Sequence, residues 1–257
     1  MRLDQFLSLA SVGTRKKVRE YIYAGNVKVN HALCTLPAEI IDENKDVISY
    51  NDTIVDITPV YYVLNKPQGH VTARELDRPN VFDCFQDIDT MGLFAVGRLD
   101  KDTEGLLIIT NDGTFSNDIM APDNHVEKTY QFLALGKLTT EHIDTLESGI
   151  DIGTNTLTKP ANVSILQEGL YRDLSRQIGS HKMKKIKKQP EDQAAFIGEI
   201  TITEGKKHQV KRMLREVGCP IIYLKRTAIG DFELPEDLGS GDYLEIPLLK
   251  LLTLINR

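Results

Sequence analysis

The stretch GRLDKDTEGLLIITNDG occupies residues 97–113 and divides into a charged loop followed by an apolar run. The run from Leu106 to Thr110 has the length of one buried β-strand. Gly97 and Gly105 bracket the charged loop, and Asn111-Asp112-Gly113 after the strand is a strong turn signal. The pattern therefore predicts a buried strand whose preceding loop presents charged side chains.

The sequence on either side of this stretch indicates strands mixed with helices. Three further strands are predicted, at Val60–Leu64, Tyr130–Leu135 and Phe196–Thr203. Helices are predicted near residues 139–148 and 207–217. Strands and helices do not alternate regularly, as they would in a doubly wound parallel sheet. We therefore expect an α+β fold with a mixed, mostly antiparallel sheet flanked by helices.

The first 58 residues are predicted to form a small α+β module of their own. Its expected elements follow each other closely: a helix over residues 2–10, a helix capped by Thr14 and ended by Gly25, a strand at Val27–Val29 and a turn at Asn30-His31. An acidic stretch then leads to Pro59, which marks the junction. The sequence thus predicts two domains, over residues 1–58 and 59–257.

The composition of the 257 residues is that of an ordinary globular protein, with 41% hydrophobic and 26% charged residues. The three cysteines form neither a CxxC motif nor a cluster with histidine, which argues against a disulfide framework or a zinc site. No run approaches the ~18 apolar residues that a membrane helix needs. We expect a cytoplasmic, monomeric protein that does not bind a membrane.

Positive charge is gathered in islands although the formal net charge is −6. Such islands can bind a nucleic-acid backbone by releasing counterions, whatever the net charge of the chain. The candidate contacts with such a backbone are Arg2, Arg15, Lys16, Lys17, Arg19 and Lys28 in the first module, and Arg98, Lys207, His208, Gln209 and Arg212 in the second part. The alternative is a set of solvated surfaces, and the Lys-rich residues 181–188 leave the same two interpretations open.

Asp100 is the candidate catalytic carboxylate of the charged loop. Arg98 and Lys101 flank it, and nearby cations favour the ionised form that a nucleophile or a general base needs. An alternative stays open at this point, because the acids of the loop are also suited to capping turns or pairing with Arg98.

The same loop partly matches the calcium loop of an EF-hand. Asp100, Asp102, Glu104 and Gly105 fit its first half. The twelfth position should supply a bidentate Glu and holds Asn111 instead, and the flanking sequences indicate strands rather than helices. Calcium binding is therefore a minor alternative. A second alternative is that the protein is a metal-dependent phosphoryl-transfer enzyme that uses Asp100 and Asp102.

The chain also resembles the RsuA-type ribosomal RNA pseudouridine synthases over nearly its whole length. GRLDKDTEGLLIITNDG is similar to their catalytic-loop signature. The chain matches three further motifs of their catalytic domain by resemblance, with LNKPQG at residues 64–69, EKTY ending at Tyr130, and EGKKHQVKRM at residues 204–213. RLDQFL, TRKKV and GNVKVN near the start resemble an S4-type RNA-binding module. The resemblance implies an enzyme that isomerises uridine to pseudouridine in ribosomal RNA without a cofactor or a metal.

The resemblance also implies roles for single residues. Asp100 corresponds to the essential aspartate, Tyr130 to the tyrosine that stacks on the target base, and Lys211 to the basic residue that pairs with the aspartate. HQVKRM, NHVEKTY and YLKR look more like the small-subunit (16S) branch. A non-catalytic RNA-binding or ribosome-assembly factor is the main alternative, since it would use the same S4 module.

Three features depart from the family pattern. His31 stands where the S4 pattern usually has Gly, and Thr14 replaces the usual Ser, a mild change for a helix cap. Residues 181–188 look like an insertion.

Overall fold

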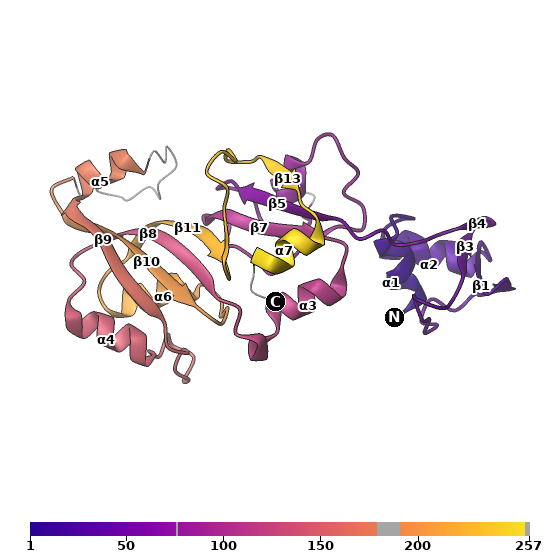
Figure 1. Ribbon diagram of the computed structural model, residues 1–257, viewed down its shortest axis with the longest axis horizontal. Helices are drawn as coiled ribbons and strands as arrows, with labels where there is room; N and C mark the ends of the chain where they lie inside the picture. The colour runs from indigo at the N-terminus through magenta and orange to yellow at the C-terminus, as the bar shows by residue number, and fades with distance from the viewer. Residues whose placement is uncertain (76, 179–190, 255–257) are drawn as a thin grey trace.

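The computed structural model describes residues 1–75, 77–178 and 191–254 and contains two separate β-sheets (Figure 1). The Lys-rich residues 181–188 lie outside the described residues. Within the described ranges, no helix combines the length and the apolar character that crossing a membrane requires. A small sheet near the N-terminus is followed by a nine-stranded sheet that contains the candidate site.

The first module packs two helices onto a four-stranded antiparallel sheet of order β2-β1-β3-β4. Its elements are α1 (Leu3–Leu9), α2 (Arg15–Tyr23), β1 (Val27–Val29), β2 (Ala32–Leu33), β3 (Ile48–Tyr50) and β4 (Thr53–Ile54). The Thr14 side chain accepts a hydrogen bond from Lys17 N, as expected of a helix cap. Asn30 and His31 have φ of 50° and 69°, so His31 adopts the left-handed backbone that glycine usually supplies.

The nine-stranded sheet has the order β13-β5-β7-β11-β8-β10-β9, with β6 and β12 paired outside this path. Its strands are β5 (Tyr61–Lys66), β6 (Phe94–Ala95), β7 (Glu104–Thr110), β8 (Lys128–Leu135), β9 (Asn162–Leu170), β10 (Ala194–Ile202), β11 (Ile221–Ile229), β12 (Phe232–Glu233) and β13 (Tyr243–Glu245). Among these described strands, β7 and β11 run parallel and the other pairs are antiparallel. The expected mixed, mostly antiparallel sheet is confirmed.

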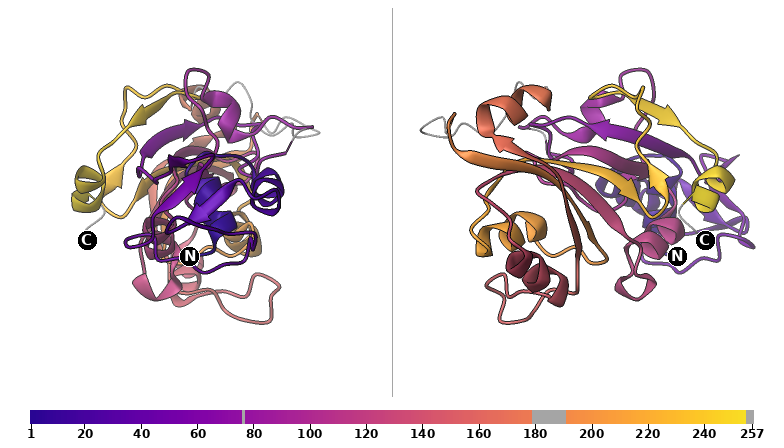
Figure 2. Two further views of the ribbon diagram at one scale, coloured as in Figure 1. Left: turned by 90° about the vertical axis from the view of Figure 1, so that its right-hand side faces the viewer. Right: turned by 60° about the vertical axis from the view of Figure 1, so that its left-hand side comes forward.

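Helices lie on both faces of this sheet (Figure 2). They are α3 (Gly113–Met120), α4 (Thr140–Ser148), α5 (Tyr171–Gln177), α6 (Gln209–Glu216) and α7 (Leu248–Leu254), with short 3-10 helices at Val81–Cys84 and Pro122–Asn124. α4 and α6 pack on one face, where Leu146 and Met213 share a buried core with Phe132 and Phe196. α5 packs on the other face through Leu174. The predicted α+β fold is confirmed, and α6 lies against the strands that line the candidate site.

The turn signal after β7 starts a helix rather than a hairpin. The Asp112 side chain accepts a hydrogen bond from Phe115 N and caps α3. The Asn111 amide accepts from Val60 N at 2.9 Å and donates to Thr58 O at 3.0 Å. It thereby fastens the end of β7 to the segment that enters the large sheet. Aspartate suits both turns and helix caps, so the residue types alone do not distinguish the two outcomes.

Candidate active site

The loop that carries Asp100 is fixed between β6 and β7. The Thr72 hydroxyl donates to Leu99 O at 2.7 Å and accepts from Leu99 N at 3.1 Å, and Leu99 is buried. Thr103 N donates to Asp100 O at 3.0 Å and closes a turn. These contacts anchor the residue before Asp100 in the core. The Asp100 side chain therefore projects from a well-supported loop and remains 28% exposed.

Gly105 is required where this loop enters β7. Its φ of +100° lies in the left-handed region, and a Cβ atom there would stand 2.2 Å from Arg226 O. Glycine therefore lets the backbones of β7 and β11 approach closely. Arg226 is paired with Gly105 on one side and with Tyr130 on the other. The strand pairing thus brings the Asp100 loop to the strand next to the one that carries Tyr130.

Lys211 reaches Asp100 from α6. Its Nζ donates to Asp100 Oδ2 at 2.8 Å, to Asp102 Oδ1 at 2.5 Å and to Thr103 Oγ1 at 3.0 Å. The Lys211 side chain is 15% exposed. His208 Nε2 lies 3.5 Å from the other carboxylate oxygen of Asp100. The Asp100 carboxylate is thus held by an ammonium group and faced by an imidazole.

Tyr130 lies half-buried in β8 and lines the same pocket as Asp100 and Lys211. The pocket has a volume of about 80 Å³. Its other lining residues are Arg98, Leu99, Thr103, Ile202, Gly205, Lys206, His208, Gln209, Val210 and Leu224. The structure therefore brings together the three residues to which the family resemblance gives catalytic roles.

Family models match both parts of the chain. Residues 60–216 match the family described as RNA pseudouridylate synthase, and residues 1–47 match the S4 domain. The chain belongs to the RNA pseudouridylate synthase family. The S4 domain in front of this catalytic domain, together with relatives that match along nearly the whole chain, places the synthase among the RsuA-type enzymes.

Relatives of this synthase carry names from both ribosomal subunits. The uncharacterized RNA pseudouridine synthase YtzG of Bacillus subtilis is 33% identical, over 96% of this chain and 95% of the relative. Ribosomal small subunit pseudouridine synthase A of Yersinia pestis is 32% identical, over 95% and 93%. Ribosomal large subunit pseudouridine synthase B of Bacillus subtilis is 34% identical, over 95% and 91%. A crystal structure of a pseudouridylate synthase superposes with a TM-score of 0.65 at 29% identity and covers 99% of each chain.

Lys66 supports the loop that carries Asp100, a role that the sequence alone did not suggest. The side chain is fully buried, and Nζ donates to Thr103 O at 2.8 Å and to Pro67 O at 3.1 Å. Burial lowers the pKa of the Lys66 ammonium group to about 8, against the opposing effects of Asp102 and Glu104. A lysine at the end of a largely apolar strand was the available signal, because such a charge must find polar partners when the strand is buried.

Three predicted RNA contacts of the first module surround one buried carboxylate. Asp4 is fully buried and pairs with Arg2 at 3.0 Å, Arg19 at 2.8 Å and Arg15 at 3.4 Å. Burial alone would raise the pKa of the Asp4 carboxyl group, but the hydrogen bonds from Arg2, Arg19 and Arg15 outweigh it and lower the pKa to about 2. The three guanidinium groups remain about half exposed, so Asp4 presents them together at the surface.

Acidification should therefore destabilise the first module through Asp4. The folded pKa of about 2 lies below the ordinary aspartate value of 3.8, so the stabilisation is complete above about pH 5 and is lost as the pH falls through the folded pKa. The pKa difference corresponds to roughly 1–2 kcal/mol once screening of the half-exposed guanidinium groups is considered. Urea unfolding followed by circular dichroism between pH 7 and pH 2 checks this. We expect Asp4→Asn to be less stable at pH 7 and to lose less stability on acidification, and parallel pH curves would contradict the expectation.

The other predicted RNA contacts fall into two groups. Lys17 and Lys28 pair with Glu20 at 2.9 Å and Asp52 at 2.5 Å on the surface, and Lys16 is exposed. Of the predicted contacts in the catalytic domain, Arg98, Lys207 and His208 are exposed and Arg212 is half-buried.

Gln209 does not fit its predicted contact with RNA, because it is 3% exposed and its amide bonds inside the protein. Lys206 was not predicted as a contact, yet it lines the pocket.

The calcium alternative has no support in the loop geometry. The ammonium group of Lys211 bridges Asp100 and Asp102, the two carboxylates that a calcium ion would need to bind. The flanking elements are strands β6 and β7 rather than two helices. In the described part of the chain, no group of three or more His, Cys, Asp or Glu residues is arranged to hold a metal ion.

Proposed function

We propose that this synthase isomerises one uridine of ribosomal RNA, and that the target lies in the small-subunit (16S) RNA. The observation that carries the proposal is the Asp100–Lys211 ion pair in a pocket that also contains Tyr130. Relatives named for both subunits support ribosomal RNA as the substrate class. The 16S choice rests on the similarity of HQVKRM, NHVEKTY and YLKR to the small-subunit branch.

Asp100 acts on the ribose of the target nucleotide. The bond between C1′ and N1 breaks, the uracil turns, and a new bond joins C1′ to C5. C5 then loses its proton and N1 gains one, so the product has the composition of the substrate. Asp100 serves in one of two ways, either by attacking C1′ or by removing the C2′ proton. The Lys211 ammonium group donates to the carboxylate and fixes its direction for both routes.

The target base must leave its stack before Asp100 can reach the sugar. Extrusion costs a few kcal/mol, and stacking on Tyr130 returns ~1–3 kcal/mol. The pocket volume of about 80 Å³ is far below the roughly 300 Å³ at the lower end of ligand sites. Entry of the nucleotide therefore requires side chains at the rim to move. His208 is exposed, lies within 3.5 Å of Asp100, and is well placed to move aside.

The S4 domain supplies attraction to the RNA backbone that offsets part of this cost. In this proposal residues 1–58 and 59–257 form the two domains, and a monomer in the cytoplasm carries both. The exposed cations of α2 and the pocket rim position the RNA, whereas the target base is recognised in the pocket.

Reversing two charges on α2 tests the S4 domain as a backbone reader. Lys16→Glu/Lys17→Glu should weaken RNA binding. It should also make the slope of log K against log salt concentration less steep, by up to ~0.9 for each duplex phosphate that the variant no longer neutralises. Filter binding between low and physiological salt measures the slope. Lys45→Glu, at an exposed lysine that pairs with Asp42, is a single charge reversal elsewhere in the same module and serves as the control that should leave the slope unchanged. An unaltered slope in the double variant would remove α2 from the RNA interface.

Site mapping tests the substrate. Small-subunit and large-subunit RNA are isolated from cells that lack the protein, incubated with it, and mapped for pseudouridine by carbodiimide modification. We expect one new pseudouridine in the small-subunit RNA. A new site only in the large-subunit RNA would overturn the 16S assignment, and no new site in either would overturn ribosomal RNA as the substrate.

A further inference from the structure

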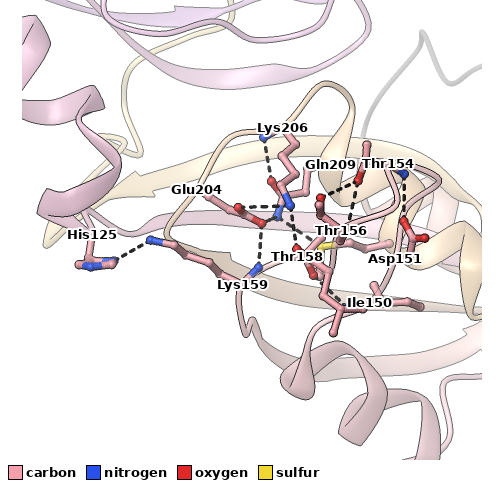
Figure 3. Close-up of polar contacts among 12 residues, drawn as sticks. His125, Ile150, Asp151, Thr154, Thr156, Thr158, Lys159, Glu204, Lys206 and Gln209 are labelled. Atoms are coloured by element: carbon pink, nitrogen blue, oxygen red, sulfur yellow. Dashed lines mark hydrogen bonds and ion pairs between the residues drawn. The ribbon is translucent and has the colours of Figure 1, made fainter.

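A hairpin of residues 150–159 docks onto the loop that leads into α6 (Figure 3). Thr158 N donates to Ile150 O at 3.0 Å and closes the hairpin. At its base, Lys159 N donates to Oε1 of Glu204 at 2.9 Å. The Glu204 side chain is 14% exposed. The hairpin thus supplies a backbone donor to a largely buried carboxylate of the loop.

Gln209, the first residue of α6, is the second partner of Glu204. Its Nε2 donates to Glu204 Oε1 at 2.8 Å, and its Oε1 accepts from Lys206 N at 2.8 Å. Nε2 also lies 3.7 Å from Met213 Sδ. With the residue 3% exposed, both ends of the amide are committed to partners inside the protein.

These bonds close residues 204–209 into a tight loop that contains a strained residue. His208 has a left-handed φ of 54° although it is not glycine. Such a conformation persists where the surrounding contacts over-determine it. Gln209 N donates to Lys206 O at 3.1 Å inside the loop, and Lys206 Nζ donates to Leu157 O of the hairpin at 2.8 Å. The loop is therefore held at both ends.

The loop determines where two pocket residues stand. His208 directly precedes α6, and Lys211 lies in its first turn, two positions after Gln209. A shift of the start of α6 displaces the backbone of Lys211 relative to Asp100 and strains their 2.8 Å contact. A displacement of about 1 Å in a catalytic group can cost about 100-fold in rate.

We propose that Glu204 and Gln209 are positioning residues of this synthase, which act through α6 on Lys211 and make no contact with RNA. The inference rests on the proposed function of the Asp100–Lys211 pair. It gives Lys159, at the base of the hairpin, an indirect part in the reaction, because the backbone N–H of Lys159 holds Glu204.

Two substitutions of Glu204 test the proposal by tritium release from RNA that carries 5-tritiated uridine. Glu204→Gln keeps an oxygen that accepts from Lys159 N and Gln209 Nε2, so it should retain most of the turnover. Glu204→Ala removes the acceptor, and kcat should fall about 10- to 100-fold with KM for RNA unchanged. Thr154→Ala, on the exposed part of the same hairpin, is the control that keeps wild-type kcat.

A raised KM at unchanged kcat in Glu204→Ala would mean that Glu204 serves RNA binding, and it would overturn the proposal. Equal losses in the Gln and Ala variants would also overturn it, because the acceptor oxygen would then be irrelevant. If Glu204→Ala does not fold, Gln209→Leu takes its place, since leucine keeps the buried volume and removes the amide.

A double-variant cycle with Lys211→Met tests the route. If the Glu204–Gln209 pair acts through Lys211, Glu204→Ala should cost much less in the Lys211→Met background than in the wild type. Residues that act independently give additive losses, so equal costs in both backgrounds would overturn the proposal. A purely structural role of Glu204 predicts that additive result.

A crystal structure of Glu204→Ala is the readout that does not depend on activity. We expect Lys211 Nζ to lie beyond about 4 Å from the Asp100 carboxylate, outside ion-pair distance. An unchanged contact overturns the positioning role whether or not the wild-type protein forms pseudouridine. An inactive wild-type protein together with a displaced Lys211 in the variant would overturn the proposed function alone.

Discussion

Asp100→Asn should abolish tritium release from RNA that carries 5-tritiated uridine, while the variant still binds that RNA. Asparagine keeps the shape of the side chain and removes its negative charge. Both chemical routes need the charge, because an amide neither attacks C1′ nor accepts the C2′ proton. We expect a loss on the order of 10⁴-fold or more, the size seen when a central catalytic carboxylate is removed. Binding should persist because the basic surfaces of both domains are unchanged.

The matched control is Asp102→Asn, two residues further along the same loop. Asp102 also contacts Lys211 Nζ, at 2.5 Å, but its side chain is 49% exposed, compared with 28% for Asp100. It lies outside the residues that line the pocket. We expect the Asp102 variant to keep a substantial part of the turnover. Comparable losses in the two variants would remove the special role of Asp100, and clear residual activity in Asp100→Asn would refute it directly.

Strands β5, β7, β8 and β10 were predictable because they carry largely apolar runs, whereas the central strand β11 was not predicted. The predicted strand Leu106–Thr110 falls within β7, whose residues after Glu104 are all buried. Edge strand β9 escaped prediction because NVSILQEGL exposes most of its side chains and shows no clean alternation. Strands β3 and β4 lie in the acidic stretch before Pro59, where no strand was predicted.

Charge was the least dependable signal for the site. The basic segment 205–226 indicates a solvated or RNA-facing surface, yet Arg226 is 3% exposed and its Nε donates to Leu106 O at 2.7 Å. Lys66 is likewise buried, and its Nζ donates to Thr103 O, 37 positions away in the chain. A single sequence does not reveal which charges are buried, since their partners come from the fold. Asp100 and Lys211 are 111 positions apart, and only the family resemblance connected them in advance.

Lys211→Met should lower kcat about 100-fold, or about 2.7 kcal/mol in the barrier, with little change in KM for RNA. Methionine fills a similar volume at this 15% exposed position, so the packing of α6 survives. What disappears is the ammonium group that donates to Asp100 and to Asp102. The two carboxylates then face each other without a cation between them, and Asp100 loses its fixed direction. Single-turnover tritium release with saturating enzyme measures the chemical step.

Lys211→Arg separates charge from geometry in the same assay. Arginine keeps the positive charge but offers a planar fork instead of a compact ammonium group, so activity should fall between those of the wild type and the Met variant. The double variant Asp100→Asn/Lys211→Met is compared with Asp100→Asn by its affinity for RNA, because neither variant is expected to turn over. If Lys211 works only through Asp100, removing it from a protein that already lacks the carboxylate leaves the Kd for RNA unchanged. A weaker affinity in the double variant would mean that Lys211 also contacts the nucleotide, and the ion pair would then be only part of its function.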